Sequence, residues 1–455
     1  MTNISRRKFT TRLASLTGLA ALGSLSGCSR QAEHNSGGSD SLRIHPLEGI
    51  AREKLKVTGV KVTPLSYVDP KGNIWRSKRE MVWKTDACVL QVFTDQGIEG
   101  VGEPSPYCLS TWDSGWGKSD GATLIKKYVA EVIEPGLLGQ NPFDVDQLCS
   151  GGENWGERCA WAGVDAALWD IIGKAKGLPV YKLLATDGEP DTHLHMYASG
   201  GDEHEWYNNG DEALIEEALR YKEMGFDAMK FRMGTDWEFS GMTLDKYIPI
   251  MQRLREAVGP DFKLCHENMD SSAITIEDLV QKFCPAIEEL KFHWFEHPMR
   301  GIENYLKVKD ALDVVKVSGG EAALTRFEVR EWLNRKAYDI VQSDTNVTGI
   351  TECWHIARMA HLMGVPHCPH SWHGSITLLM NAHLVAAIPN RHMLERNMTF
   401  NPFHTDLVKD MPPIVDGFMD LPDKPGLGIE LTDDLEKRFP YSPGHYGKPN
   451  PVFAR

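Results

Sequence analysis

The feature that most constrains this fold is a repeat of short apolar runs in the second half of the chain. Each run has the length of a strand and is followed by a polar turn and an amphipathic, helix-like stretch. The runs cover residues 194–198, 228–231, 262–265, 292–295, 314–317, 339–341 and 364–367. Strands that alternate with helices predict a parallel sheet, and seven or eight such units predict a closed α/β barrel.

Most of these runs end in ionisable side chains. Successive ends lie 23 to 37 residues apart, and in chain order they carry Lys230 with Arg232, then Glu267, Glu296, Glu321, Asp344 and His370. A strand–helix unit needs a length of this order. Because the loops after the strands build the active site of such a barrel, we expect these ends to meet at one mouth.

Three of the converging groups are glutamates. Carboxylates that face one point repel each other unless they bind protons or a cation. A ligand set made only of oxygen atoms favours Mg²⁺ over Zn²⁺, with Mn²⁺ as a substitute. We therefore predict a magnesium site formed by Glu267, Glu296 and Glu321.

The other ends suit acid–base chemistry. Beside a divalent cation and Arg232, the pKa of Lys230 would be lowered toward that of a useful base. Asp344 can fix the tautomer of His370, which would then act from the other side of the site. This set fits removal of a proton alpha to a carboxylate, with the cation stabilising the resulting enediolate.

The first half of the chain has a different pattern. Alternating apolar residues predict strands at 55–67 and 81–94, and a turn at 95–97 leads into a third strand at 98–101. Helical patterns follow at 121–134 and 159–176. An antiparallel sheet followed by helices predicts an α+β domain in front of the barrel.

Several strings, taken in this order, resemble the enolase superfamily and its mandelate racemase/muconate lactonizing branch. The resemblance extends from about residue 54 to the C-terminus, and its strings are Val101-Gly102-Glu103, Ala166-Ala167-Leu168-Trp169-Asp170-Ile171 with Gly173-Lys174-Ala175, Trp294-Phe295-Glu296-His297-Pro298, Gly319-Gly320-Glu321 and Pro425-Gly426-Leu427-Gly428-Ile429-Glu430. The resemblance implies a (β/α)₇β barrel, TIM-like, with an α+β capping domain. We expect the capping domain at residues 53–190, the barrel at 191–395 and a segment completing the capping domain at 396–455.

The resemblance also implies roles for individual residues. The Lys-x-Lys motif of the family is matched by Lys230-Phe231-Arg232, and a late glutamate near the mouth is matched by Glu395. Its metal ligands and its Asp–His dyad match the glutamates and the Asp344–His370 pair named above. Arg232 departs from the motif. Since an arginine stays protonated, we expect it to hold a substrate carboxylate or to tune Lys230.

Some assignments stay open at the level of sequence. The string Cys265-His266-Glu267 allows His266 as the first ligand, although Glu267 keeps the set all-oxygen. His367 and His373 lie close to His370 and could contact substrate, pack in the structure, or form a separate Zn²⁺ site with it. Trp75 and Arg76 lie in a loop that the resemblance places over the barrel mouth, so we count them as candidate substrate contacts.

The N-terminus carries the pattern of an export signal. Arg6 and Arg7 precede an apolar stretch at 13–25, which resembles a twin-arginine signal, and Leu25-Ser26-Gly27-Cys28 resembles a lipobox. We expect a signal at residues 1–28, lipidation at Cys28 and a flexible tether at 29–52. A plain signal peptide with a chance cysteine is the alternative. The mature protein would be periplasmic or otherwise extracytoplasmic, with a lipid anchor as its single link to the membrane.

Composition excludes other classes of function. The 455 residues carry a net charge of −14, which argues against a nucleic-acid partner, and nine cysteines are too few for a disulfide scaffold. From the residues at the mouth and the resemblance together, we predict a Mg²⁺-dependent dehydratase of a sugar acid, an aldonate or aldarate. The resemblance also implies assembly as a homo-oligomer. A racemase or epimerase with the same intermediate is the first alternative, and a non-catalytic sugar-acid-binding lipoprotein is the second.

Overall fold

The computed structural model describes residues 45–70, 75–76, 80–107, 120–201, 212–232, 241–269 and 273–449. All of them belong to the unit Leu42–Arg455. The predicted signal, Cys28 and most of the predicted tether lie outside the described residues, so these assignments stay predictions. Trp75 and Arg76 form strand β2 (Trp75–Arg76), and their side chains lie outside the description.

The capping domain is built on a three-stranded antiparallel sheet. Its strands are β1 (Val57–Val68), β4 (Lys84–Thr94) and β5 (Glu99–Gly102), in the order β1-β4-β5. The strands predicted from alternation are therefore present, and the turn between β4 and β5 contains Gly97 with a φ of 75°. The accompanying helical elements are α1 (Gly121–Tyr128), η1 (Val129–Ile133), α2 (Glu134–Leu137), η2 (Pro142–Asp144), α3 (Val145–Leu148), α4 (Trp155–Lys176) and α5 (Val180–Leu184).

Helix α4 packs against β5 at very close range. Asn154 caps its first turn, and Gly177, in a left-handed conformation, ends it. A Cβ atom added at Gly100 would overlap the carbonyl oxygen of Ala167, and one added at Gly102 would overlap that of Gly163. Glycine is therefore required on β5 for the strand to lie directly on the helix backbone.

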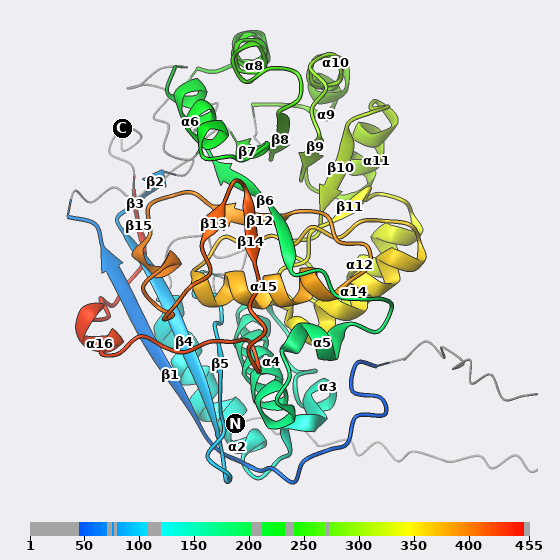
Figure 1. The fold of residues 1–455 in the computed structure, drawn as a ribbon. Helices are drawn as coiled ribbons and strands as arrows, with labels where there is room; N and C mark the ends of the chain where they lie inside the picture. Colours follow the sequence, from blue (N-terminus) through cyan, green and yellow to red (C-terminus); the bar gives the residue numbers. More distant parts are fainter. Residues whose placement is uncertain are drawn as a thin grey trace, which may run out of the picture. The chain divides into compact units, whose positions relative to one another are not determined.

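The second domain is a parallel barrel. Its strands pair in chain order, and they are β6 (His193–Gly200), β7 (Ala228–Arg232), β8 (Lys263–Glu267), β9 (Trp294–Glu296), β10 (Lys316–Gly319) and β11 (Ile340–Val341). The helices between and after them are α6 (Glu212–Glu223), α8 (Leu244–Val258), α9 (Ile276–Asp278), η3 (Leu279–Phe283), α10 (Cys284–Glu289), α11 (Ile302–Asp310), α12 (Arg326–Asn334), α13 (Thr345–Thr348), α14 (Ile350–Leu362) and α15 (Ser375–Ala387) (Figure 1).

The barrel closes through two isolated bridges and one further strand. His367 bridges Val341 on one side and Arg391 on the other, and β12 (Leu394–Asn397) pairs in parallel with β6. The run at 364–367 thus contributes a bridged residue rather than a longer strand, because Pro366 lacks the N–H that a longer ladder would use. The repeating runs predict a closed barrel, and the ring has the (β/α)₇β architecture that the resemblance implies.

The barrel interior consists of layers of alternating side chains. One apolar layer of buried residues comes from every part of the ring except β10, and it contains Tyr197, Ala228, Cys265, Trp294, Ile340, Cys368 and Met393. Successive inward-facing residues of a strand are two positions apart. The next inward positions on the same strands are Ser199, Lys230, Glu267, Glu296, Gln342, His370 and Glu395. The polar layer therefore rests on an apolar floor.

The C-terminal segment contacts both domains. The hairpin β13 (Ile414–Val415) and β14 (Phe418–Asp420) extends the sheet from the first half of β6. The short helix η4 (Pro402–His404) precedes it, and α16 (Leu435–Arg438) then contacts β1. Strand β15 (Gly447–Pro449) pairs with β3 (Glu80–Val82), so this segment contacts the N-terminal strands after it has extended the barrel sheet.

The packed structure begins before the predicted domain boundary at residue 53. Residues 45–50 form a turn, and Leu47 and Ile50 in it pack against the core. Their apolar side chains explain why the end of the range 29–52 is held to the folded unit. Within the described residues, no helix has the length and apolarity needed to cross a membrane.

Candidate active site

Three glutamates meet at the mouth of the barrel. Glu267 ends β8, Glu296 ends β9, and Glu321 follows β10, and each offers an oxygen atom within 4.8 Å of those of the other two. Two of them are followed by residues with left-handed backbone, Asn268 with a φ of 53° and His297 with a φ of 44°. Non-glycine residues rarely adopt this conformation, and they concentrate at functional sites.

Lys230 lies beneath this cluster in an almost fully buried position. Its Nζ atom is 3.0 Å from Glu296 Oε1, 2.9 Å from Glu395 Oε1 and 3.6 Å from Glu267 Oε2. Burial alone would lower the pKa of Lys230, but the surrounding carboxylates raise it well above its usual value. The lowered pKa of Lys230 that the sequence analysis expects requires a cation that cancels the charge of these carboxylates.

Arg232 lies two residues further along β7 and is about a third exposed. Its guanidinium is 3.3 Å from Glu267 Oε1 and lies 5.7 Å from the ring centre of Trp372. The planar, permanently charged guanidinium suits a carboxylate ligand and cannot accept a proton. Arg232 thus presents a fixed positive charge beside the glutamates.

Asp344 and His370 form the predicted pair. His370 Nδ1 is 2.8 Å from Asp344 Oδ2, and His370 Nε2 is 3.6 Å from Glu321 Oε2. Burial lowers the pKa of His370, but Glu321, Glu395 and Asp344 outweigh it and raise this pKa to about 10. With these carboxylates ionised, His370 is an imidazolium that can donate a proton.

Asn381 on α15 holds this pair in place, and sequence reasoning missed it. Its side-chain NH₂ donates to Asp344 Oδ1 and to the backbone oxygen of His370, both at 3.1 Å. Its Oδ1 atom accepts from the backbone N–H and the hydroxyl of Thr345. Both donor hydrogens and both acceptor positions of this buried amide are therefore used, and these bonds fix the orientation of the Asp344–His370 pair. An asparagine within a mainly apolar helical run is the signal that could have indicated it.

Two further residues orient Glu296 from below. Gln342 Nε2 donates to Glu296 Oε2 at 2.6 Å, and Trp294 Nε1 donates to the same oxygen at 3.1 Å. Gln342 lies two positions before Asp344, on the same inward-facing side of the chain. Period-2 alternation along this stretch could have identified it.

The electrostatics of the glutamates fit a cation. Burial raises the pKa of Glu296 to about 7, and the neighbouring carboxylates add to this against the lowering by Lys230. For Glu267, Lys230 and Arg232 outweigh burial and lower the pKa to about 2. An all-oxygen donor set of converging carboxylates, one of them destabilised in its charged form, matches the chemistry of Mg²⁺ binding.

The structure separates the remaining histidines. His266 points away from the cluster, because it is fully buried with its Nε2 atom 2.7 Å from the hydroxyl of Tyr247. Glu267, and not His266, therefore lies with the other glutamates. His367 is also fully buried in the barrel wall, 2.8 Å from the hydroxyl of Ser343, so the structure favours a packing role for it.

His373 and Glu395 take other positions. The ring of His373 stacks on that of Tyr107 in the capping domain, with ring centres 5.4 Å apart. Burial lowers the pKa of His373 to about 4. Because His367, His370 and His373 have different partners, they do not form the separate zinc site that the sequence allowed. Glu395 lies in the mouth beside Lys230, and its Oε2 accepts from the backbone N–H of Ser371 at 2.6 Å.

Comparison with known proteins places this geometry in a family. Residues 75–185 match the mandelate racemase / muconate lactonizing enzyme N-terminal domain, and residues 213–435 match the enolase C-terminal domain-like family. The chain carries the two domains of the enolase superfamily. A crystal structure of an enolase superfamily member from Polaromonas sp. JS666 superposes with a TM-score of 0.72 and 29% identity, covering 86% of this chain and 99% of that one.

Curated relatives within this superfamily have named activities. An arabinonate dehydratase of Saccharolobus solfataricus is 29% identical over 361 residues, which cover 77% of this chain and 89% of the relative. A D-galactarolactone cycloisomerase of Agrobacterium fabrum is 29% identical over 348 residues, which cover 71% of this chain and 87% of the relative. The prediction that this enolase-superfamily chain is an enzyme related to sugar-acid dehydratases is confirmed by such relatives.

Proposed function

We propose that the protein is a Mg²⁺-dependent dehydratase of a sugar acid, an aldonate or an aldarate. The observation that carries this proposal is the order of groups around the mouth: Lys230 with Arg232, then the three glutamates, then Asp344 with His370. The similarity to arabinonate dehydratase supports the class of substrate. Mg²⁺, or Mn²⁺ in its place, would neutralise the charge that develops on the substrate carboxylate as its α-proton leaves.

The residues divide the reaction between two sides of the mouth. Lys230 takes the α-proton, and it can do so only in its neutral form, which requires the charge of its glutamate partners to be taken up. Arg232 binds the substrate carboxylate through its planar guanidinium. His370, an imidazolium paired through its Nδ1 with the carboxylate of Asp344, protonates the departing β-hydroxyl. Loss of water then gives a 2-keto-3-deoxy acid.

Lys230 and His370 are also the groups that an epimerase would use on opposite faces of one carbon. We test the two reactions with a panel of acid sugars and Mg²⁺ in D₂O, following keto-acid formation and deuterium in recovered substrate. A dehydratase gives keto acid, whereas deuterated stereoisomers without keto acid would establish epimerisation. Binding of an acid sugar with neither product would establish a non-catalytic protein.

Two variants test the division of roles. We expect Lys230→Ala to lose both elimination and α-proton exchange, with a fall in kcat of about 10²–10⁴-fold or more. His370→Asn should block elimination and keep α-proton exchange, because Lys230 and the cation suffice for that step. His361→Ala, an exposed residue on α14, is the matched control and should behave as wild type. The reverse pattern of exchange would make His370 the base.

A further inference from the structure

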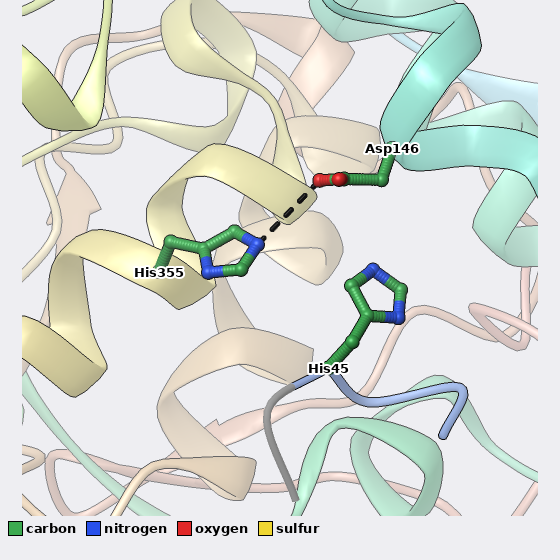
Figure 2. Close-up of side chains that lie close together, drawn as sticks. All are labelled: His45, Asp146 and His355. Atoms are coloured by element: carbon green, nitrogen blue, oxygen red, sulfur yellow. Dashed lines mark ion pairs between the residues drawn. The ribbon is translucent and has the colours of Figure 1, made fainter. Parts of the chain in front are cut away.

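A second group of metal-ligating side chains lies outside the barrel mouth. His45 belongs to the N-terminal turn, Asp146 to α3 and His355 to α14, and each offers a ligand atom within 4.8 Å of those of the other two. Figure 2 shows the three side chains converging, with one ring nitrogen of His45 facing the space between Asp146 and His355. Three segments far apart in the sequence thus meet at one point.

Both imidazoles have a buried ring nitrogen without a hydrogen bond among the described residues at this point. The Nε2 atoms of His45 and His355 are buried and make no hydrogen bond to any residue that the structure describes. His355 Nε2 is 3.5 Å from Asp146 Oδ1. Two ligand atoms at about 2.1 Å from one tetrahedral ion lie about 3.4 Å apart, so this pair already has the spacing of two ligands of one zinc ion.

We propose that His45, Asp146 and His355 bind a divalent transition-metal ion of the Zn²⁺ class. Two imidazoles and one carboxylate are borderline ligands that suit Zn²⁺, whereas the glutamates of the barrel mouth are hard ligands that suit Mg²⁺. The two sites therefore select different ions. The fourth position of the zinc-class site is left for a water molecule, as in other sites with three protein ligands.

The site binds its ion against two competing interactions. The backbone N–H of Leu47 donates to His45 Nδ1 at 3.1 Å. An ion bound at Nε2 would require the ring proton to be on Nδ1, and a protonated Nδ1 cannot accept this hydrogen bond. The guanidinium of Arg326 lies 3.3 Å from Asp146 Oδ1, but it donates two shorter hydrogen bonds to Glu352 Oε1, from Nη2 at 2.5 Å and from Nε at 2.9 Å. Glu352 thus balances the positive charge that would otherwise oppose a cation.

A bound ion would fasten the N-terminal turn to both domains at once. The ring of His45 packs near Trp354 and His355, with ring centres 6.4 Å and 6.0 Å away, but no hydrogen bond of its side chain reaches α3 or α14 in the described structure. Metal coordination adds that link between residue 45, the capping domain and the barrel. The ion's role is therefore to fix the point where the N-terminal segment joins the folded unit.

The test measures zinc binding to the EDTA-treated full chain by equilibrium dialysis, with millimolar Mg²⁺ present to occupy the carboxylate site. We expect one equivalent of Zn²⁺ in the wild type. His45→Ala and His355→Ala should weaken binding by at least about a hundredfold, since loss of even an outer partner of a metal site costs 10–100-fold. His361→Ala, on the same helix α14, should bind as wild type.

Two further readouts separate the proposal from misfolding and from binding elsewhere. With Co²⁺ in place of Zn²⁺, the wild type and Glu296→Gln should show the visible absorption spectrum of a low-coordinate site. His355→Gln should not show this spectrum. Thermal unfolding of metal-free His355→Gln checks that this variant is folded. Zinc should also slow tryptic cleavage after Arg52 in the wild type and not in Asp146→Asn. Unchanged zinc binding by His45→Ala, or no zinc equivalent in the presence of Mg²⁺, would overturn the site. Equal cleavage rates with and without zinc would overturn its fastening role.

Discussion

At the scale of single residues, the candidate site depends on groups that do not contact the expected cation. The glutamates converge because β8, β9 and β10 end at one mouth, but Gln342 and Trp294 set the orientation of Glu296. Asn381 does the same for Asp344 and His370. Outer partners of this kind typically change activity or metal affinity 10–100-fold when removed.

Asn381 gives a test of this arrangement. We expect Asn381→Ala to lower kcat/KM about 10–100-fold and to shift the pH profile of activity, because His370 loses the anchor of its carboxylate partner. Asn390→Ala is the matched control, since Asn390 also donates two hydrogen bonds, to the backbone oxygens of Ala357 and Val365 away from the dyad. The measurements are a pH–rate profile and thermal unfolding. A loss of stability in both variants with an unchanged pH profile would leave Asn381 a purely structural residue.

At the scale of elements, the junction between the two domains is carried by β5, α4 and α15. Helix α15 is buried along its whole length and contacts β5 of the capping domain as well as β6 and β12 of the barrel. Its sequence is mainly apolar, as expected for a helix without a solvent face, and its polar residues Thr377 and Asn381 are hydrogen-bonded inside the protein. The end of β5 leads into Glu103, which accepts hydrogen bonds from the backbone N–H and the hydroxyl of Thr377 in the first turn of α15.

The close packing of β5 on α4 predicts a large effect for a small change. Gly102→Ala places a methyl group onto the carbonyl oxygen of Gly163, and backbone cannot move aside as a flexible side chain can. We expect a loss of about 1–3 kcal/mol in the free energy of unfolding, measured by chemical denaturation. Gly136→Ala is the matched control in the same domain, because its added Cβ meets no atom within 4 Å. Equal stability of the two variants would contradict this packing.

The buried Glu103 predicts a pH dependence of stability. Burial raises its pKa from 4.5 to about 7, against the lowering by the Thr377 hydrogen bonds. The folded state then holds a proton that the unfolded state releases, so this group's contribution to stability is present below pH 4.5 and is lost as the pH rises toward 7. The free energy of unfolding of Glu103→Gln, measured relative to that of the wild type, should increase by at most about 3 kcal/mol between pH 5 and pH 8. Denaturant titrations at both values measure this, and a constant difference would contradict it.

At the scale of the whole molecule, the expected cation links folding to function. The three glutamates of the mouth come from consecutive strand units, so an ion bound by them would stabilise the barrel by mass action. We expect saturating Mg²⁺ to raise the unfolding temperature and the free energy of unfolding by about 2.7 kcal/mol at a hundredfold excess over Kd. EDTA should reverse this and abolish activity.

Glu296→Gln is the variant that tests this link. It keeps the shape of the side chain but removes one charge and one ligand, so the stabilisation by Mg²⁺ and the activity should both be lost. His361→Ala should keep both. A Glu296→Gln protein that Mg²⁺ still stabilises as it does the wild type would contradict the ligand assignment.

The barrel and the ionisable groups at its mouth could be predicted from the sequence, because both follow from local patterns. Runs of apolar residues at the spacing of strand–helix units predict the parallel ring, and the ionisable residues after most of the runs predict what faces the mouth. The same reasoning found Lys230, the glutamates and the Asp344–His370 pair, since strand ends in a parallel barrel share one edge.

The assignments that depend on side-chain direction and on distant partners required the folded structure. It turned His266 toward Tyr247 and Glu267 toward the mouth, a difference of one position in an alternating strand. It placed Glu395 beside Lys230 and brought His45, Asp146 and His355 together from three separate segments. Contacts of this kind are set by how the packed elements close in space, and no local pattern of residues records that closure.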